Sequence, residues 1–289
     1  MNGWRRILAL PGAEGGADQI AVLRAFELIL LMHVTTRIWL WALRPYVPAG
    51  DAKLLVVITV TVVALAALKR NWARPAAAMI ALILFGKMLA TFPAASNHSL
   101  LELAGVTLLA LLDRQLPEER SILQQALCWM VAIVLFSSGL QKVLYGTYFD
   151  AQFLGAFIAL KPSFAQAFGS LLPAAELSRL QSLPMSEGAG PFAVDSVAVV
   201  VLSNAVYAFE MAAPAFLLWS RTRAFGMLAA IVFTVALQTA ARELLFGGLL
   251  VNMLLLFAPR ANLQVLPLFA LFYAGLLAMR LLAPEVYFN

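Results

Sequence analysis

Two short polar segments interrupt the apolar runs of this chain, and both carry residue types that can move protons. The first contains Asn97, His98, Ser99 and Glu102, and the second, Ser137–Lys142, closes a later apolar run. Ionisable groups inside a bilayer are rare and are usually paired or functional. We therefore expect the two segments to meet inside a membrane bundle and to form one site.

His98 and Glu102 are four residues apart, which places them on one face of a helix. A carboxylate beside an imidazole fixes its tautomer and raises its basicity, so Glu102 would support His98. The alternative is a helix start capped by Asn97 or Ser99, with Ser99 and Glu102 as a capping box and His98 incidental. Metal binding is not expected, because the other histidine, His33, belongs to a different apolar run without further ligands.

Lys142 stands at the end of its apolar run, and two interpretations apply to it. A lysine at a helix end commonly extends its amine to the membrane surface. The neighbouring Ser138, Gly139 and Gln141 instead favour a packed, polar-lined site, where burial would disfavour the charged amine. A neutral amine can act as a base, which gives Lys142 a catalytic interpretation.

The other ionisable groups within apolar runs are interpreted as structural, because such groups usually pair with one another. Arg24 and Glu27 are three residues apart and share a helix face. Glu210 needs a donor, and the candidates are Arg24, Arg37 and Arg242. Three further polar residues are expected to form interhelical hydrogen bonds: Thr234, Gln238 and Asn252.

The composition places the chain in the membrane. Of its 289 residues, 63% are hydrophobic and 12% are charged, whereas soluble domains average about 45–50% apolar and about 25% charged residues. Long apolar runs that mostly do not alternate favour helices over an outer-membrane barrel. Basic residues lie mostly between these runs, which fits membrane orientation and not nucleic-acid binding. The single cysteine, Cys128, excludes an intrachain disulfide.

We predict an all-α polytopic transmembrane helix bundle with about eight or nine membrane segments, in one domain covering 1–289. No cleavable signal peptide is expected at the N-terminus. The predicted spans are 18–43, 52–68, 75–91, 95–112, 122–144, 197–219, 224–241, 244–257 and 265–282.

Three stretches do not read as ordinary crossings. Residues 1–17 are interpreted as a short surface arm. The run 244–257 is short for a crossing, and with the preceding span it is predicted to form a re-entrant-like helical hairpin buried in protein. Residues 145–194 carry aromatic residues and prolines, and we predict short interfacial helices and loops there.

The basic residues favour a cytoplasmic N-terminus, because ten of them then fall inside and five outside. The ten are Arg5, Arg6, Lys69, Arg70, Arg74, Arg114, Arg120, Arg221, Arg223 and Arg260, and the five are Arg44, Lys53, Lys161, Arg179 and Arg242. This orientation puts residues 145–194 and both polar segments on the non-cytoplasmic side, which supports a shared pocket there.

At these residues the sequence resembles the membrane domain of the vitamin K-dependent gamma-carboxylases and their bacterial relatives, the horizontally transferred transmembrane (HTTM) family. Asn97-His98-Ser99 resembles the family's Asn-Asn-His-Ser segment, and Ser138–Lys142 resembles its Ala-Gly-x-Lys-Lys segment. Phe209–Leu218 with the basic loop Arg221–Arg223, and the stretch 233–259, are similar as well. The resemblance extends over nearly the whole chain.

The resemblance implies chemistry on reduced vitamin K. Lys142 matches the lysine that deprotonates the hydroquinone; oxygen then adds, and the strong base so formed removes a proton from a glutamate side chain. Carbon dioxide captures the carbanion, and the vitamin leaves as its epoxide. His98 matches a histidine near the reacting groups. The implied cofactors are a menaquinol-type hydroquinone, O2 and, for carboxylation, CO2, with no metal.

Three departures from the family pattern bear on peptide carboxylation more than on quinone chemistry. Gln141 stands where the family has the first of two lysines, and Thr234 stands where it has a histidine. The large non-cytoplasmic domain that recognises the substrate is expected to be absent, because the chain ends at Asn289.

The leading hypothesis is an enzyme of the bacterial inner membrane that oxidises a hydroquinone to its epoxide with O2, alone or coupled to glutamate carboxylation or another peptide modification. Lys142 would be the base and His98 would orient the reacting groups. The supporting or cofactor-binding candidates are Asn97, Ser99, Glu102, Gln141, Tyr145 and Glu210.

The alternative is a non-catalytic membrane protein that binds a quinone or lipid and assists export, maturation or immunity of a secreted peptide. A transporter ranks last, because no pair of broken helices in corresponding halves marks a midplane site. The expected partners are a quinone or other hydrophobic small molecule, membrane lipid and a peptide or protein substrate; nucleic acid is not expected.

Overall fold

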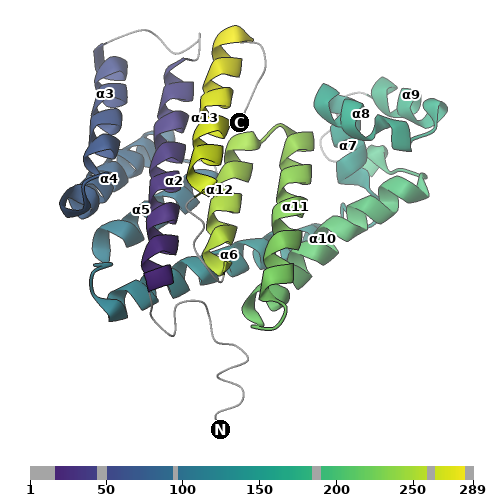
Figure 1. Ribbon diagram of the computed structural model, residues 1–289. Coiled ribbons are helices and arrows are strands. Elements are labelled where there is room, and N and C mark those ends of the chain that lie inside the picture. Colours follow the sequence, from purple (N-terminus) through teal and green to yellow (C-terminus); the bar gives the residue numbers. More distant parts are fainter. Residues whose placement is uncertain (1–16, 44–50, 94–96, 184–189, 259–263, 284–289) are drawn as a thin grey trace. The chain divides into compact units, whose positions relative to one another are not determined.

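A computed structural model of the protein describes residues 17–43, 51–93, 97–183, 190–258 and 264–283 (Figure 1). Regular secondary structure within these ranges is entirely helical, as the long apolar runs predict. The predicted surface arm before residue 17 lies outside the described residues.

Six of the described helices are long and apolar enough to cross a membrane. About 20 helical residues, at about 1.5 Å each, cross a hydrocarbon core of about 30 Å. The six are α2 (Ala17–Ala42), α4 (Ala73–Thr91), α6 (Pro117–Tyr145), α10 (Val197–Leu218), α11 (Arg223–Ala241) and α13 (Val265–Leu282). They indicate an integral membrane protein built as a helical bundle.

Three further apolar helices are shorter than a full crossing requires. They are α3 (Asp51–Ala66), α5 (Asn97–Leu111) and α12 (Leu244–Leu254), the last continued by the 3-10 turn η4 (Leu255–Phe257). Each coincides with a predicted span, so the positions of the helices are confirmed. The predicted number of eight or nine membrane segments stays a prediction.

Two helices begin earlier than the sequence indicated. We predicted that α6 begins at residue 122 after a charged connection, whereas it begins at Pro117. Proline fits the first turn of a helix, and the acidic Glu118 and Glu119 interact favourably with the helix N-terminus. The residues taken as a connection are therefore helix-start residues. Likewise, α4 begins at Ala73, two residues before Pro75.

The chain forms two compact units. We call residues Trp129–Glu243 the α10 unit, and the described residues up to Cys128, together with those from Leu244, the α2 unit. The first boundary falls inside α6, and the second falls between α11 and α12. The predicted single domain and the predicted α11–α12 hairpin stay predictions.

In the α2 unit, α2 is the central helix. It packs against α3, α5, α12 and α13, and Figure 1 shows it between α3 and α13. Leu30, Ile29 and Val34 are almost completely buried, as expected of a helix that is apolar on most sides. The Asn252 side-chain amide of α12 donates to the Phe26 carbonyl of α2 over 3.1 Å, which confirms an interhelical bond for Asn252.

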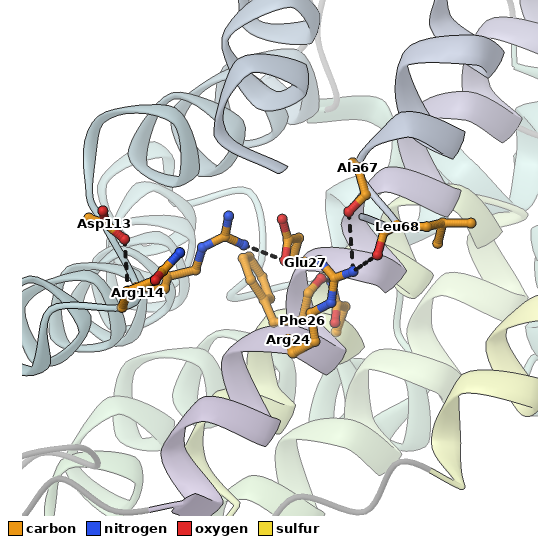
Figure 2. Close-up of polar contacts among 9 residues, drawn as sticks. Arg24, Phe26, Glu27, Ala67, Leu68, Asp113 and Arg114 are labelled. Carbon is orange, nitrogen blue, oxygen red and sulfur yellow. Dashed lines mark hydrogen bonds and ion pairs between the residues drawn. The ribbon is translucent and has the colours of Figure 1, made fainter. Parts of the chain in front are cut away.

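A buried carboxylate in the first half of α2 joins this helix to two other segments, as Figure 2 shows. Glu27 is 1% exposed and pairs with Arg24 over 2.6 Å, as predicted, and also with Arg114 from the segment between α5 and α6. Arg24 additionally donates to the carbonyls of Ala67 and Leu68, just beyond the end of α3. These last carbonyls have no partner within the helix, so one cluster joins three parts of the unit.

The α10 unit combines α10, α11 and the second half of α6 with short helices. These are α7 (Gln152–Leu160), α8 (Pro162–Phe168) and α9 (Ala174–Ser182). Their core contains Leu154, Ile158, Phe164, Leu180 and Phe192. The prediction of short helices within 145–194 is confirmed, while their place at a membrane interface stays a prediction.

Candidate functional site

In the α10 unit, Lys142 of α6 forms an ion pair with Glu210 of α10. The Lys142 Nζ lies 2.6 Å from Glu210 Oε2 and donates to Ser138 Oγ over 2.7 Å. The two charged side chains are 16% and 6% exposed. Ser138 lies one helical turn before Lys142, so α6 supplies the amine and a neutral acceptor from the same face.

Gly139 allows α6 and α10 to cross closely enough for this pair. A Cβ atom at this position would lie 2.9 Å from the Tyr207 carbonyl oxygen and 3.0 Å from the Met211 amide nitrogen. Backbone atoms cannot move aside as a flexible side chain can. Small residues at such crossings are the usual means of close helix approach in membranes. Ser138 therefore accepts a hydrogen bond from Lys142, and Gly139 allows the close helix approach that the ion pair requires.

Replacing Gly139 by leucine is expected to force α6 away from α10 and to break the Lys142–Glu210 pair. Overpacking of this kind lowers the free energy of unfolding by about 1–3 kcal/mol. The matched control is Gly86→Leu on α4, where nothing lies within 4 Å of the added Cβ. Thermal unfolding in detergent measures both, and equal unfolding temperatures would contradict a close crossing at Gly139.

The partner of Glu210 corrects a sequence prediction. We considered Arg24, Arg37 and Arg242 as donors, but Lys142 takes this position. Arg37 pairs with Glu102 instead. The apolar run around Glu210 indicated that its carboxylate needs a donor, but the choice of donor depends on which helices cross.

Aromatic side chains lie beside the ion pair, and sequence reasoning did not include Tyr148 among the site residues. The Tyr148 ring centroid is 5.5 Å from Lys142 Nζ and 5.0 Å from the Phe153 ring, on which it stacks. The Ser203 hydroxyl of α10 donates to the Tyr148 carbonyl over 2.9 Å. Burial raises the pKa of the Tyr148 hydroxyl, and the Glu210 carboxylate raises it further, so it stays a phenol at neutral pH.

Two predicted supporting residues on α6 point away from this cluster. Gln141 is exposed, and Tyr145 is 79% exposed. Gln141 is adjacent to Lys142 in sequence and therefore lies on another side of α6, whereas Tyr145 follows Lys142 by three residues and is exposed at the last position of the helix. Their roles in binding a cofactor stay predictions. The aromatic residue that contacts Lys142 comes after the helix ends.

Two buried side chains of α11 have polar atoms without hydrogen-bond partners. They are Thr234 Oγ1 and Gln238 Oε1, in residues 2% and 7% exposed, and neither has a partner among the described residues. We predicted interhelical hydrogen bonds for them, and these atoms make none. The Phe209 and Phe233 rings, 4.5 Å apart, set the register of α10 and α11.

In the α2 unit, Glu102 of α5 is the centre of a second polar cluster. Its carboxylate is 1% exposed, accepts from His33 Nε2 over 2.8 Å, and pairs with Arg37. Since an ionised carboxylate can only accept, Nε2 carries a proton, and Nδ1 lies 3.2 Å from the Tyr273 hydroxyl, from which it accepts when the ring is neutral. Arg37 also donates to Ser99 Oγ over 2.7 Å.

His98 does not share this carboxylate by hydrogen bonding. Both Glu102 oxygens bond to α2 residues, while the His98 ring stacks on Phe246 with centroids 3.9 Å apart. His98 Nδ1 is buried and has no partner among the described residues. Glu102 therefore orients His33, a residue that sequence reasoning left outside the site. Four-residue spacing made a contact with His98 feasible but did not select it.

The start of α5 bears on the capping interpretation. The helix begins at Asn97, so Ser99 lies in its first turn and not before it. Glu102 binds α2 side chains, which excludes it from a capping box. The side chain of Asn97 lies outside the described residues.

The cluster around Lys142 and the cluster around Glu102 are described separately, because Lys142 belongs to the α10 unit and His98 to the α2 unit. A pocket shared by the two stays a prediction. Within the described ranges, His, Cys, Asp and Glu side chains form no group of three that could hold a metal ion; chemistry without a metal also stays a prediction.

Comparison with protein-family models, with curated proteins and with solved structures gives no match to this chain. The resemblance carried by the motifs around His98, Lys142 and Glu210 is therefore a hypothesis about family and function. The function of the protein is therefore inferred below from the geometry of the two polar clusters.

Proposed function

We propose that this protein is a membrane enzyme that oxidises a reduced, membrane-soluble quinone with O2, using Lys142 as the base. The observation that carries the proposal is the Lys142–Glu210–Ser138 cluster, with Nζ 2.6 Å from a carboxylate oxygen at a helix crossing. The proposal includes a bacterial inner-membrane location, a cytoplasmic N-terminus and about eight or nine membrane segments.

Burial of the ion pair supports a chemical role. Removing two charges from water has a large free-energy penalty, and attraction within the pair often fails to offset it. Transfer of one proton from Lys142 to Glu210 makes both groups uncharged. The amine is then a base within a low-dielectric site, and Glu210 holds the proton that the amine gave up.

The proposed reaction begins with proton transfer from a hydroquinone hydroxyl to the Lys142 amine. The ammonium so formed lies beside Glu210 and Ser138, whose oxygens stabilise it. The anion of the hydroquinone is more easily oxidised by O2. In sum, one hydroquinone and one O2 give one quinone epoxide and one water.

Neighbouring groups fit a flat ring with polar edges. Tyr148 offers an aromatic face next to Nζ, and aromatic rings pair at centroid distances of about 4.5–7 Å. Thr234 Oγ1 and Gln238 Oε1 have no partners within the described part of the chain. Buried polar groups without any partner are destabilising, and a ligand hydroxyl that reached them would supply the missing hydrogen bond.

Oxygen uptake tests the proposal directly. Purified protein in lipid nanodiscs, supplied with a prenylated naphthohydroquinone, is expected to consume O2 and to yield the epoxide, which mass spectrometry identifies. A glutamate-rich peptide with labelled bicarbonate shows whether carboxylation is coupled. Oxygen uptake no faster than in protein-free nanodiscs, in a preparation that binds the quinone, would favour the non-catalytic binding protein instead.

A further inference from the structure

Three basic side chains gather where α3 ends in the α2 unit, and Figure 2 shows the first of them. Arg24 of α2 donates to the Ala67 and Leu68 carbonyls over 3.1 and 2.8 Å, so its guanidinium lies beside the turn that follows α3. The next two residues of this turn are Lys69 and Arg70, and both are exposed. We call Arg24, Lys69 and Arg70 the α3-end site; all three belong to one compact unit.

The carboxylate beside the α3-end site does not balance its charge. Glu27 pairs with both Arg24 and Arg114, so a single carboxylate faces two guanidinium groups. Lys69 and Arg70 make no ion pair with any described residue. Four cations and one carboxylate therefore leave three positive charges without a counter-charge from the described part of the chain.

The carboxylates of the segment between α5 and α6 are already engaged elsewhere. Asp113 pairs with Arg74 over 3.2 Å. Glu119 accepts from the Asp113 backbone amide over 2.5 Å. Neither carboxylate contacts Lys69 or Arg70, so an anion from outside the protein is needed to neutralise the exposed pair.

The residues around the α3-end site place it at the boundary between lipid headgroups and hydrocarbon. Trp72, in the 3-10 turn η1 (Arg70–Trp72), is 58% exposed, and tryptophan is enriched at this boundary in membrane proteins. Leu65 and Leu68 are 59% and 57% exposed on the preceding turns. Exposed cations thus directly follow exposed leucines, which matches the polarity of a lipid molecule.

An open groove between α2, α3 and α13 begins beside the α3-end site. Its volume is about 570 Å³, and its lining includes Leu65 and Leu68. Most of the lining is apolar and would accept a hydrocarbon chain of any lipid. Selection between lipids therefore depends on the cations at its end.

We infer that the α3-end site binds an anionic phospholipid, with the phosphate at Lys69 and Arg70 and an acyl chain along Leu65 and Leu68. Basic pockets between membrane helices bind such headgroups, and each basic residue near the membrane surface strengthens binding about fivefold. A zwitterionic lipid carries its own cation, which these side chains repel. The inference is independent of the chemistry proposed for Lys142, which lies in the other unit.

Native mass spectrometry of the full-length protein in detergent tests the inference with two lipids of identical acyl chains. Phosphatidylglycerol is expected to bind at least about fivefold more tightly than phosphatidylcholine. The double variant Lys69→Gln/Arg70→Gln should lose this preference and leave phosphatidylcholine binding unchanged. Both positions are exposed, so its unfolding temperature should stay close to that of the wild type.

A matched double variant separates this site from the general charge of the protein. Lys161→Gln/Arg221→Gln removes two exposed cations from the α10 unit and should keep the preference for phosphatidylglycerol. An equal preference in the two double variants would overturn the inference, as would equal binding of both lipids by the wild type. Glycerophosphoglycerol, the headgroup without chains, should not displace the lipid; displacement at an equal concentration would indicate a site for soluble phosphates and overturn the assignment to a lipid.

Discussion

Replacing Lys142 by methionine is expected to abolish hydroquinone-dependent oxygen uptake. Methionine retains the length and apolar stem of lysine but has no amine to accept a proton. A positioned general base contributes about 100- to 10,000-fold to a rate, so uptake should fall to the protein-free background. Initial rates of oxygen consumption, with epoxide formation measured in parallel, provide the readout.

The single substitution also affects stability, and this must be separated from catalysis. Lys142→Met leaves Glu210 buried without its 2.6 Å partner, and breaking a buried pair lowers the free energy of unfolding by about 3–5 kcal/mol. The double variant Lys142→Met/Glu210→Gln removes both charges, and such neutral replacements are often well tolerated. It is expected to unfold close to the wild-type temperature.

The double variant separates a catalytic role from a purely structural one. If Lys142 is the base, the double variant is stable and consumes no oxygen above background. If the pair only joins α6 to α10, restoring stability also restores turnover. Wild-type rates in the double variant would therefore remove Lys142 from the mechanism, whatever the single variant does.

Helix positions were accessible from the sequence because they depend on local pattern. Long apolar runs gave the described helices, and the interruption at Arg242 and Glu243 coincides with the break between α11 and α12. The start of α6 was missed because its acidic residues looked like a solvated connection. Pro117 followed by Glu118 and Glu119 is typical of the first turn of a helix as well as of a charged connection. The pattern alone did not distinguish the two.

Side-chain partners were less accessible, because they depend on which helices cross. Glu210 and Lys142 are separated by 68 residues, and their contact requires a backbone approach that only Gly139 allows. Helical spacing correctly paired Arg24 with Glu27 within one helix. No rule based on spacing connects residues of two helices whose register is unknown.

His33 shows which information was present but not used. Its four-residue spacing from Arg37 put both on one face of α2 and required an acidic partner. Glu102 was assigned to His98 on its own helix, although a carboxylate buried in a bundle usually pairs with a neighbouring helix. The cluster of His33, Arg37 and Glu102 was therefore not predicted, although the sequence shows all three residues.

Truncating Glu102 to alanine is expected to destabilise the α2 unit strongly. It leaves Arg37 without its ion pair and the His33 ring, 1% exposed, without the acceptor that fixes its tautomer. The loss for a broken buried pair is about 3–5 kcal/mol. Glu102→Gln should lose less, since its amide keeps an acceptor for Arg37.

Cys128 provides the measurement. It is the only cysteine in the chain and is 0% exposed, so a thiol-reactive dye reports unfolding when the buried thiol becomes accessible. The control is Glu118→Ala, an exposed carboxylate on α6, for which a change within about 0.5 kcal/mol is expected. The unfolding temperature should be highest for Glu118→Ala, lower for Glu102→Gln and lowest for Glu102→Ala. If Glu102→Ala and Glu118→Ala unfold at the same temperature, the polar cluster around Glu102 does not hold α5 to α2.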